Sequence, residues 1–426
     1  MLSTNPHAFE VTVSAPVNIA VVKYWGKRDT SLLLPTNSSL SLTLSQGDLR
    51  STTTVRADSS FERDRLWLNG KEEDVTKNKR MVNVVRELRS LRQRMEEDDA
   101  SLEKLSAQKL HVCSQNNFPT AAGLASSASG FAALTFGIAH AIGVADKVSR
   151  SDLSRLARLG SGSACRSLFG GFVAWEMGSR SDGIDSVAVQ VADESHWSDM
   201  EALVLVASDA RKDTPSTAGM QLTVETSELL QERIRQVPRR MDDMKQAIAN
   251  KDYDAFAELT MMDSNQFHAV CLDTFPPITY LNDVSRAVIH LITAYNALFT
   301  GDGKSGRGKK GYRAAYTFDA GPNAVLYILK EHVPEVLALV NRFFPAPEGE
   351  GERKEYFGRA ANYMGSENVK AVDDMVSKIG MTPLNKGSLR RIISTSVGDG
   401  PRILARGWNA HVSLLGEDGL PKKEIA

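Results

Sequence analysis

The sequence has little of several features that mark particular classes of protein. No apolar run approaches the ~20 residues that a transmembrane helix needs, so we expect no membrane-spanning segment. The first residues, MLSTNPHAFE, lack both a basic start and an apolar stretch, so we expect no secretory signal. The formal net charge is -1 at pH 7. This balance provides no overall basic field to hold nucleic acid or a membrane surface.

Cysteine is scarce as well. Cys113, Cys165 and Cys271 are odd in number and widely spaced, which predicts reduced thiols in a cytoplasmic compartment. The sequence does not distinguish the cytosol from the peroxisome. The cysteines form no metal-binding pattern with the eight histidines, so we expect no structural zinc site.

The remaining composition is that of a globular protein large enough for two domains. The chain has 426 residues, of which 42% are hydrophobic and 24% charged. Leu203–Ala207 reads as a nearly continuous apolar strand. We place a boundary just before it, which divides the chain into residues 1–195 and 196–426.

Hydrophobic patterns predict a mixture of strands and helices in the first part of the chain. Alternation from Phe9 predicts a strand, and the Asn69-Gly70 pair predicts a hairpin turn. Helical spacing predicts an amphipathic helix over about 75–97. An apolar, alanine-rich segment predicts a buried helix over Phe131–Ile142, and a further helix is expected from Ser151.

The second part is predicted to be mainly helical before it returns to a strand. The pattern is helical from about 216 to 272, with Pro238 placed at a helix start. Ala314–Phe318 reads as a strand that ends at a sharp turn. Two polar, glycine-rich segments, Gly301–Gly311 and Ala346–Arg353, are expected to be surface insertions.

A run of small residues, Pro119–Gly130, lies between a predicted strand and a predicted helix. Small residues allow close approach to an anion, and a helix N-terminus offers unpaired N–H groups. Ser126, Ser127 and Ser129 add hydroxyls that could reach phosphate oxygens. The alternative is a helix packed tightly on a sheet, and the run alone does not decide between the two. It is neither a P-loop nor a dinucleotide-binding glycine motif.

Compared with known families, the run resembles the phosphate-binding motif of the GHMP kinase superfamily, P-x-x-x-G-L-G-S-S-A. Ala125 replaces the usual glycine, a departure shared by the diphosphomevalonate decarboxylase branch. Three further stretches resemble that same branch: Ala15–Asp29, Gly160–Gly171 and Ala315–Val325.

The resemblance implies an α+β, two-lobed GHMP kinase fold. An N-terminal α/β lobe would carry the phosphate loop, and a ferredoxin-like C-terminal lobe would carry Asp319, with the active site in the cleft between them. It also implies the ATP-dependent decarboxylation of mevalonate 5-diphosphate to isopentenyl diphosphate, a step of isoprenoid and sterol biosynthesis. Members are commonly homodimers. The nearest alternative is a GHMP small-molecule kinase that phosphorylates a mevalonate-like hydroxyl without decarboxylation.

The same resemblance assigns the ATP side of the site. Ser127 is expected to contact the transferred phosphate and Mg²⁺, and no dedicated carboxylate cage for the metal is expected. The residues expected at the ATP phosphates are Ala121, Ala122, Gly123, Leu124, Ala125, Ser126 and Ser127.

The residues expected to carry the chemistry come from distant parts of the chain. Asp319 would be a base or an orienting group, although an aspartate there could also cap its own turn. Arg166 would bind the substrate carboxylate through paired hydrogen bonds, although an arginine could also serve a surface ion pair. Lys23 would lie near the reacting groups, and Asn18 would position Arg166 by a hydrogen bond.

Further residues match substrate positions of the family. Lys27 is expected near the diphosphate. Cys165 is expected to be a buried small side chain rather than a nucleophile, and His268 a core histidine. The substrate-binding set is Tyr24, Trp25, Gly26, Lys27, Arg80, Ser161, Gly162, Ser163, Ala164, Cys165, Arg166 and Thr217.

Overall fold

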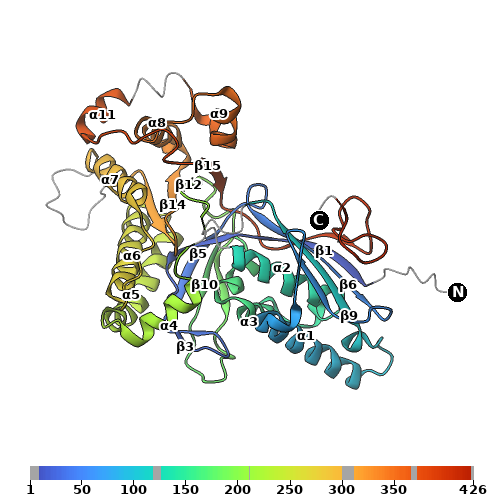
Figure 1. Ribbon diagram of the computed structural model, residues 1–426. Coiled ribbons are helices and arrows are strands. Elements are labelled where there is room, and N and C mark those ends of the chain that lie inside the picture. Colours follow the sequence, from blue (N-terminus) through green and yellow to red (C-terminus); the bar gives the residue numbers. More distant parts are fainter. Residues whose placement is uncertain (1–8, 119–125, 211, 300–310, 366–371, 424–426) are drawn as a thin grey trace.

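The structure is a computed structural model that describes residues 9–118, 126–210, 212–299, 311–365 and 372–423 (Figure 1). Helices and sheets are both abundant, which confirms the predicted α+β class. None of the helices in these ranges combines the length and apolar character needed for a membrane span. Residues 301–310 of the first predicted insertion lie outside the described residues.

A six-stranded sheet dominates the N-terminal part and has the strand order β16-β1-β6-β9-β7-β8. Its outermost strand, β16, comes from the far end of the chain and pairs antiparallel with β1. The predicted hairpin at Asn69-Gly70 is present between β7 and β8. The strands are β1 (Glu10–Pro16), β6 (Arg50–Asp58), β7 (Arg65–Leu68), β8 (Lys71–Glu73), β9 (Lys109–Asn116) and β16 (Arg402–Arg406).

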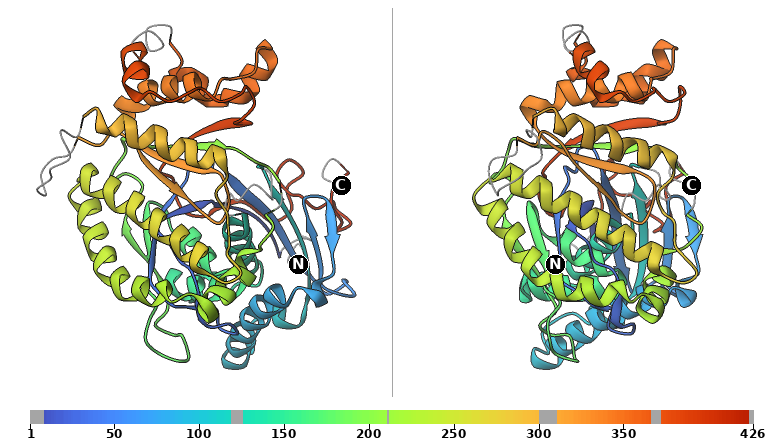
Figure 2. Two further views of the ribbon diagram at one scale, coloured as in Figure 1. Left: turned by 60° about the vertical axis from the view of Figure 1, so that its left-hand side comes forward. Right: turned by 90° about the vertical axis from the view of Figure 1, so that its left-hand side faces the viewer.

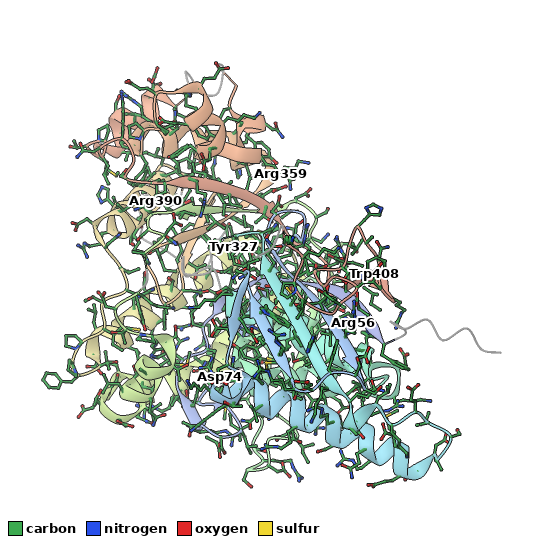
Figure 3. All side chains as sticks on the ribbon, turned by 45° about the vertical axis from the view of Figure 1, so that its right-hand side comes forward. Arg56, Asp74, Tyr327, Arg359, Arg390 and Trp408 are labelled. Atoms are coloured by element: carbon green, nitrogen blue, oxygen red, sulfur yellow. The ribbon has the colours of Figure 1, made fainter. Side chains whose placement is uncertain are left out.

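Two four-stranded sheets, with orders β11-β10-β5-β2 and β13-β14-β12-β15, complete the framework. They are joined where the Tyr327 hydroxyl donates to the Ile19 carbonyl at 3.0 Å, and Figure 3 labels Tyr327 in this central position. The first sheet contains β2 (Asn18–Val22), β5 (Ser39–Thr43), β10 (Phe172–Trp175) and β11 (Ala188–Ala192), and the second β12 (Met200–Val206), β13 (Ala315–Phe318), β14 (Ala324–Leu329) and β15 (Arg391–Ser396). A small ribbon pairs β3 (Lys27–Asp29) with β4 (Leu34–Pro35).

Three helices cover one face of the six-stranded sheet. They bury an apolar core with the strands, in which Val13, Val55 and Ile138 are fully enclosed. The predicted amphipathic helix is present as a 3-10 turn, Val75–Lys77, followed by α1 (Lys79–Asp98). The others are α2 (Ser126–Ala141), which begins earlier than predicted, and α3 (Arg150–Gly160), which leads into the 3-10 segment η4 (Gly162–Leu168).

Four helices follow β12 and form a layer on the side of the four-stranded sheets, as Figure 2 shows. They are α4 (Ser216–Thr226), α5 (Leu229–Ala249), α6 (Tyr253–Asp273) and α7 (Asp283–Ala297). Among them, α6 packs against both β2 and β13, which belong to different sheets. It therefore contacts the two strands that precede Lys23 and Asp319.

One local prediction was wrong. Pro238 lies inside α5 and not at a helix start, because α5 begins at Leu229, where Ser227 Oγ accepts the Leu230 N–H at 3.2 Å. The segment Ala346–Arg353 lies largely at the surface, as predicted, and α9 (Glu350–Phe357) begins within it. The buried Tyr356 anchors that helix by donating its hydroxyl to the Phe344 carbonyl at 3.0 Å.

The last helices of the chain cover the sheet β13-β14-β12-β15, at the top of Figure 1. They are α8 (Val333–Phe343), α9 and α11 (Asp373–Ile379). Elsewhere in the chain and between these helices, short 3-10 segments occur at Leu105–Ala107, Ala145–Lys147, Lys330–His332 and Gly358–Tyr363.

Candidate active site

A cavity of about 880 Å³ opens where the first four-stranded sheet meets α4, η4 and the turn after β13. Five cationic side chains and two carboxylates line it, although the whole chain carries a formal charge of only -1. These charged groups are Lys23, Lys27, Arg80, Arg166, Lys212, Asp213 and Asp319. The cavity is thus suited to an anionic ligand.

Lys23 and Asp319 form an ion pair at the floor of the cavity. Each residue directly follows a strand, β2 and β13 respectively, and their Nζ and Oδ1 atoms are 2.6 Å apart. Lys23 is almost fully buried, whereas the Asp319 side chain is 29% exposed and lines the cavity. Burial lowers the pKa of Lys23, and the Asp319 and Asp263 carboxylates oppose that effect. The Asp319 carboxylate therefore engages a cation from another part of the chain, beyond its own turn.

Arg166 is a buried cation held by neutral groups. Its Nε donates to Ser41 Oγ at 2.9 Å and to Asn18 Oδ1 at 3.3 Å, and Nη1 donates to Ser39 Oγ at 2.6 Å. The predicted hydrogen bond from Arg166 to Asn18 is present. Within the described ranges no carboxylate forms an ion pair with Arg166. A buried cation without a counter-anion is unfavourable, so the site is arranged to receive an anion from outside the chain.

Asn18 is itself fixed from the opposite side. Its Nδ2 donates to Ser167 Oγ at 2.7 Å and to the Ser163 carbonyl at 3.1 Å. These bonds turn its oxygen toward Arg166, so the strand β2 and the segment η4 together orient the guanidinium.

A second cationic subsite contains Lys27 and Arg80. Burial, with a contribution from the neighbouring Arg80 guanidinium, lowers the pKa of Lys27 to about 8. Arg80, at the start of α1, donates to Thr217 Oγ1 at the start of α4. Among the residues that the structure describes, neither cation forms an ion pair with a carboxylate. Tyr24 also lines this region, and its buried hydroxyl has no hydrogen-bond partner in the described part of the chain.

Hydroxyl groups converge on the N-terminal end of α2. Ser126 and Ser127 line the cavity, and Ser161 Oγ donates to Ser127 Oγ at 3.3 Å. Ser129 has a different place: it is fully buried and shares a hydrogen bond with Ser51 Oγ at 2.7 Å. The predicted phosphate contacts of residues 121–125 lie outside the described residues.

Three residues of the predicted substrate set do not line the cavity. Ala164 and Cys165 are fully buried behind it, and burial raises the pKa of the Cys165 thiol to about 12. Cys165 is therefore the buried small side chain that was expected. Gly26 shapes the loop instead, because its φ of +94° and a Cβ-to-Thr36 Oγ1 distance of 2.8 Å leave no room for a side chain.

The structure also shows where the predicted residues Trp25 and His268 lie. Trp25 reaches the cavity but is mainly a core residue, with Nε1 donating to Thr223 Oγ1 at 2.9 Å. His268 is 7% exposed beside the Phe318 ring, and burial lowers its pKa to about 3. His268 is therefore a core residue as predicted, but it is not fully satisfied, since its buried Nε2 has no hydrogen-bond partner in the described part of the chain.

Lys212, which follows β12 in a polar loop, was not among the predicted site residues. Its Nζ donates to Ser216 Oγ at 2.8 Å and to the Ala320 carbonyl at 2.9 Å, so it joins α4 to the turn that carries Asp319. Burial lowers the pKa of Lys212, and Asp319 opposes this. The available signal was a lysine that follows an apolar strand, as Lys23 follows β2. Other unpredicted lining residues are Ala20, Leu33, Asp213, Pro215, Ser216, Met220, Phe267 and Ala320.

Comparison with known proteins places these residues in a family context. Residues 15–188 match the diphosphomevalonate decarboxylase-like N-terminal domain, and residues 202–404 match the mevalonate 5-diphosphate decarboxylase C-terminal domain. The diphosphomevalonate decarboxylase of Ganoderma lucidum is 55% identical over 415 residues, which is 97% of this chain and 99% of that protein.

Solved structures are similar over nearly the whole length. A crystal structure of mevalonate 5-diphosphate decarboxylase has a TM-score of 0.80 and 49% identity, and covers 96% of this chain and 99% of that chain. A structure described as MDDEF in complex with MVAPP, AMPPCP and magnesium has a TM-score of 0.70 and 28% identity, with coverage of 93% and 98%.

Proposed function

The chain belongs to the diphosphomevalonate decarboxylase family, and from this membership we propose how its cavity performs the reaction. The enzyme converts mevalonate 5-diphosphate and ATP into isopentenyl diphosphate, carbon dioxide, ADP and phosphate. The observation that carries the proposal is the presence, in one cavity, of a buried arginine with no carboxylate ion pair among the described residues, a separate cationic subsite and the Lys23–Asp319 pair. A substrate with a carboxylate at one end and a diphosphate at the other matches this distribution of charge.

Two separate cationic regions bind the two ends of the substrate. Arg166 binds the carboxylate, because its planar guanidinium matches the geometry of two carboxylate oxygens. Lys27 and Arg80 bind the diphosphate, with the Tyr24 hydroxyl as a further donor. The tertiary hydroxyl then lies between these ends, where Asp319 lines the cavity.

The first chemical step is phosphorylation of the tertiary hydroxyl. A β-hydroxy acid has no neighbouring carbonyl to accept the electrons released by decarboxylation, so the hydroxyl must become a better leaving group. Its oxygen forms a bond to the γ-phosphorus of ATP while the bond to ADP breaks. Asp319 accepts or orients the hydroxyl proton, and Lys23 holds that carboxylate in place through the 2.6 Å contact.

The second step breaks two bonds. The tertiary carbon–oxygen bond breaks and phosphate departs with its electron pair. The carbon–carbon bond to the carboxylate then breaks, and its electrons form the new double bond as carbon dioxide leaves. The cationic side chains of Lys23, Arg166 and Lys212 stabilise the departing phosphate and the carboxylate until both bonds have broken.

The ATP phosphates bind where α2 begins. Ser126 and Ser127 line the cavity there, and the helix N-terminus adds its partial positive charge. AMPPCP is an analogue of ATP, and its binding with magnesium to a relative supports ATP as the co-substrate here. In the described residues no cluster of three or more metal-ligating side chains occurs. Ser127, which lines the cavity, would hold a Mg²⁺ that keeps most of its waters, and such an ion would neutralise phosphate charge.

Product analysis tests the proposal. Incubation with ATP and mevalonate 5-diphosphate should yield isopentenyl diphosphate, identified by mass spectrometry, together with carbon dioxide. A kinase that stops after the first step would accumulate a doubly phosphorylated acid instead, and that product would support the alternative function.

Three broader predictions belong to this proposal. We retain two lobes, residues 1–195 and 196–426, although the strand β16 returns to the N-terminal sheet. A homodimer is expected from the family. The three cysteines are free and buried, which agrees with a reducing cytoplasmic compartment.

A further inference from the structure

A fully buried charged cluster lies directly behind Lys23 and outside the cavity. At its centre is Asp263 of α6, which is 0% exposed. Its carboxylate accepts hydrogen bonds from Arg233 at 2.9 and 3.1 Å and from Arg240 at 2.7 Å. It also accepts the backbone N–H of Lys23 at 2.7 Å.

The cluster holds the backbone of Lys23 from both sides. While Asp263 accepts the N–H, Arg233 Nη2 donates to the Lys23 carbonyl at 2.8 Å. Asn37 Nδ2 donates to the same carbonyl at 2.9 Å. Both backbone polar groups of Lys23, its N–H and its carbonyl, are therefore bound by charged or amide side chains, and the start of the Lys23 side chain is fixed.

The next residue of α6 acts on the other member of the ion pair. Ser264 Oγ accepts the backbone N–H of Phe318, the residue before Asp319, at 3.1 Å. Consecutive positions of one helix thus hold the chain next to Lys23 and the chain next to Asp319. A rigid helix sets the separation of two groups that belong to different sheets.

Burial of this cluster is unfavourable in itself. Removing charged groups from water is expensive, and a buried ion pair is weak evidence for stability because apolar side chains of similar volume often serve as well. Burial opposes ionisation of Asp263, but the two arginines and the Lys23 N–H outweigh it and lower the pKa of Asp263. A charged cluster at this place therefore calls for a role beyond packing.

We propose that Asp263, together with Arg233 and Arg240, is a positioning group that holds Lys23 against Asp319 in the reacting geometry. The inference rests on the role proposed above for Lys23. It assigns these three residues no contact with substrate; they act through the backbone and the charge of Lys23.

The charges around Lys23 provide a readout that a purely structural cluster would not alter. The charged and titratable groups that face Lys23 come from four parts of the chain. They are Asp319 after β13, Asp263 and His268 on α6, Arg233 on α5 and Arg166 in η4. Asp263 raises the pKa of Lys23. Replacing it with asparagine removes that effect and leaves two arginines unneutralised, so the Lys23 pKa falls. The alkaline limb of the kcat profile should then move to lower pH.

The test uses Asp263→Asn, Arg240→Met and Arg240→Lys in the full-length enzyme, with activity expressed per folded protein. We expect kcat to fall on the order of 10- to 100-fold in Asp263→Asn, since small displacements of a reacting group have effects of this size. The KM for ATP should stay within about twofold, since ATP binds at α2. Arg240→Met should show a smaller loss, and Arg240→Lys should recover most of it because a donor to Asp263 remains.

Glu10→Gln is the matched control, because Glu10 and Arg56 form another buried ion pair between β1 and β6. Figure 3 shows Arg56 beside the C-terminal segment that carries Trp408, and it donates to the Gly416 carbonyl of that segment. This variant should lose thermal stability while its kcat and alkaline limb stay at the wild-type values.

Two results would overturn the inference. One is destabilised Asp263→Asn and Arg240→Met enzymes with wild-type kcat and an unshifted alkaline limb. The other is wild-type kcat in Lys23→Met, which would remove the role of Lys23 and with it the need to position that residue. If Lys23→Met is inactive while the cluster variants are normal, the proposed function survives and the positioning role alone fails. If Asp263→Asn does not fold, the difference in kcat between Arg240→Met and Arg240→Lys tests the positioning role instead. Equal, wild-type kcat values in these two variants would contradict it.

Discussion

At the scale of single residues, Asp319 is expected to contribute through its charge. Asp319→Asn keeps the size of the side chain but removes the carboxylate that Lys23 contacts at 2.6 Å. We expect kcat to fall by roughly 10³-fold or more, while nucleotide affinity is retained because the proposed phosphate site lies at α2 and does not include Asp319. Steady-state kinetics and nucleotide titration measure the two effects. Full activity in this variant would exclude Asp319 from the reaction.

Arg166 gives a different expectation, because we assign it to the carboxylate end of the substrate. Arg166→Lys preserves the charge but cannot form two parallel hydrogen bonds, nor can it satisfy Asn18, Ser39 and Ser41 together. We expect the KM for mevalonate 5-diphosphate to rise by at least about tenfold, which corresponds to about 1.4 kcal/mol of lost binding. Unchanged KM and kcat would contradict the assignment.

Lys27 predicts a pH dependence. Its pKa of about 8 in the free enzyme means that it is protonated below that pH and neutral above it. Only the ammonium form attracts the diphosphate, so kcat/KM should decline as pH rises through about 8, whereas kcat at saturating substrate should change little. In Lys27→Arg, the decline should move to higher pH, because arginine stays charged. A decline at the same pH in that variant would place the titration elsewhere.

At the scale of elements, the packing of α3 on α2 sets the position of Ser161. Gly160 ends α3, and a Cβ added there would lie 2.6 Å from Cγ of Phe131 on α2. Gly160→Ala should therefore destabilise the fold by about 1–3 kcal/mol and lower Tm.

Gly130 provides the matched control, because it lies within α2 and an added Cβ would meet no atom within 4 Å. Gly130→Ala should raise the stability by about 0.5–1 kcal/mol, since alanine favours a helix over glycine. Thermal unfolding of both variants checks the pair. An equal change in Tm would mean that the contact with Phe131 does not determine the effect.

The elements also show what the sequence could predict. Helical periodicity placed α1 and the helical region that contains α4, α5 and α6, and a turn dipeptide placed the β7–β8 hairpin. Pro238 was misplaced because local propensity favoured a helix start there, whereas α5 begins nine residues earlier, at Leu229. That start is held by a tertiary contact that no local pattern shows: the Asp273 carboxylate of α6 accepts the Leu229 N–H at 3.0 Å and the Ser227 hydroxyl at 2.7 Å.

The site could be predicted only where a motif carried it. Lys23, Arg166 and Asp319 lie in stretches that resemble a family, and the structure brings them to one cavity. Lys212 lies in no such stretch, and a lysine in a polar loop looks like a solvated surface residue. In the sequence, Asp263 has the pattern of an exposed charge on a helix. Only the fold shows that two arginines contact it.

At the scale of the whole molecule, the distribution of charge matters more than its sum. The chain has a formal charge of -1, yet its main cavity is lined by five cations and two carboxylates. Composition therefore excluded a general affinity for nucleic acid but could not reveal a local anion site. The return of β16 to the N-terminal sheet was also beyond local patterns, because it depends on pairing over almost the whole length of the chain.

The central claim is that one cavity phosphorylates the tertiary hydroxyl and then completes the decarboxylation. The most direct measurement is the ratio of carbon dioxide to ADP released by the wild-type enzyme from mevalonate 5-diphosphate. We expect one carbon dioxide for each ADP throughout the reaction. Stoichiometric ADP without carbon dioxide would contradict it.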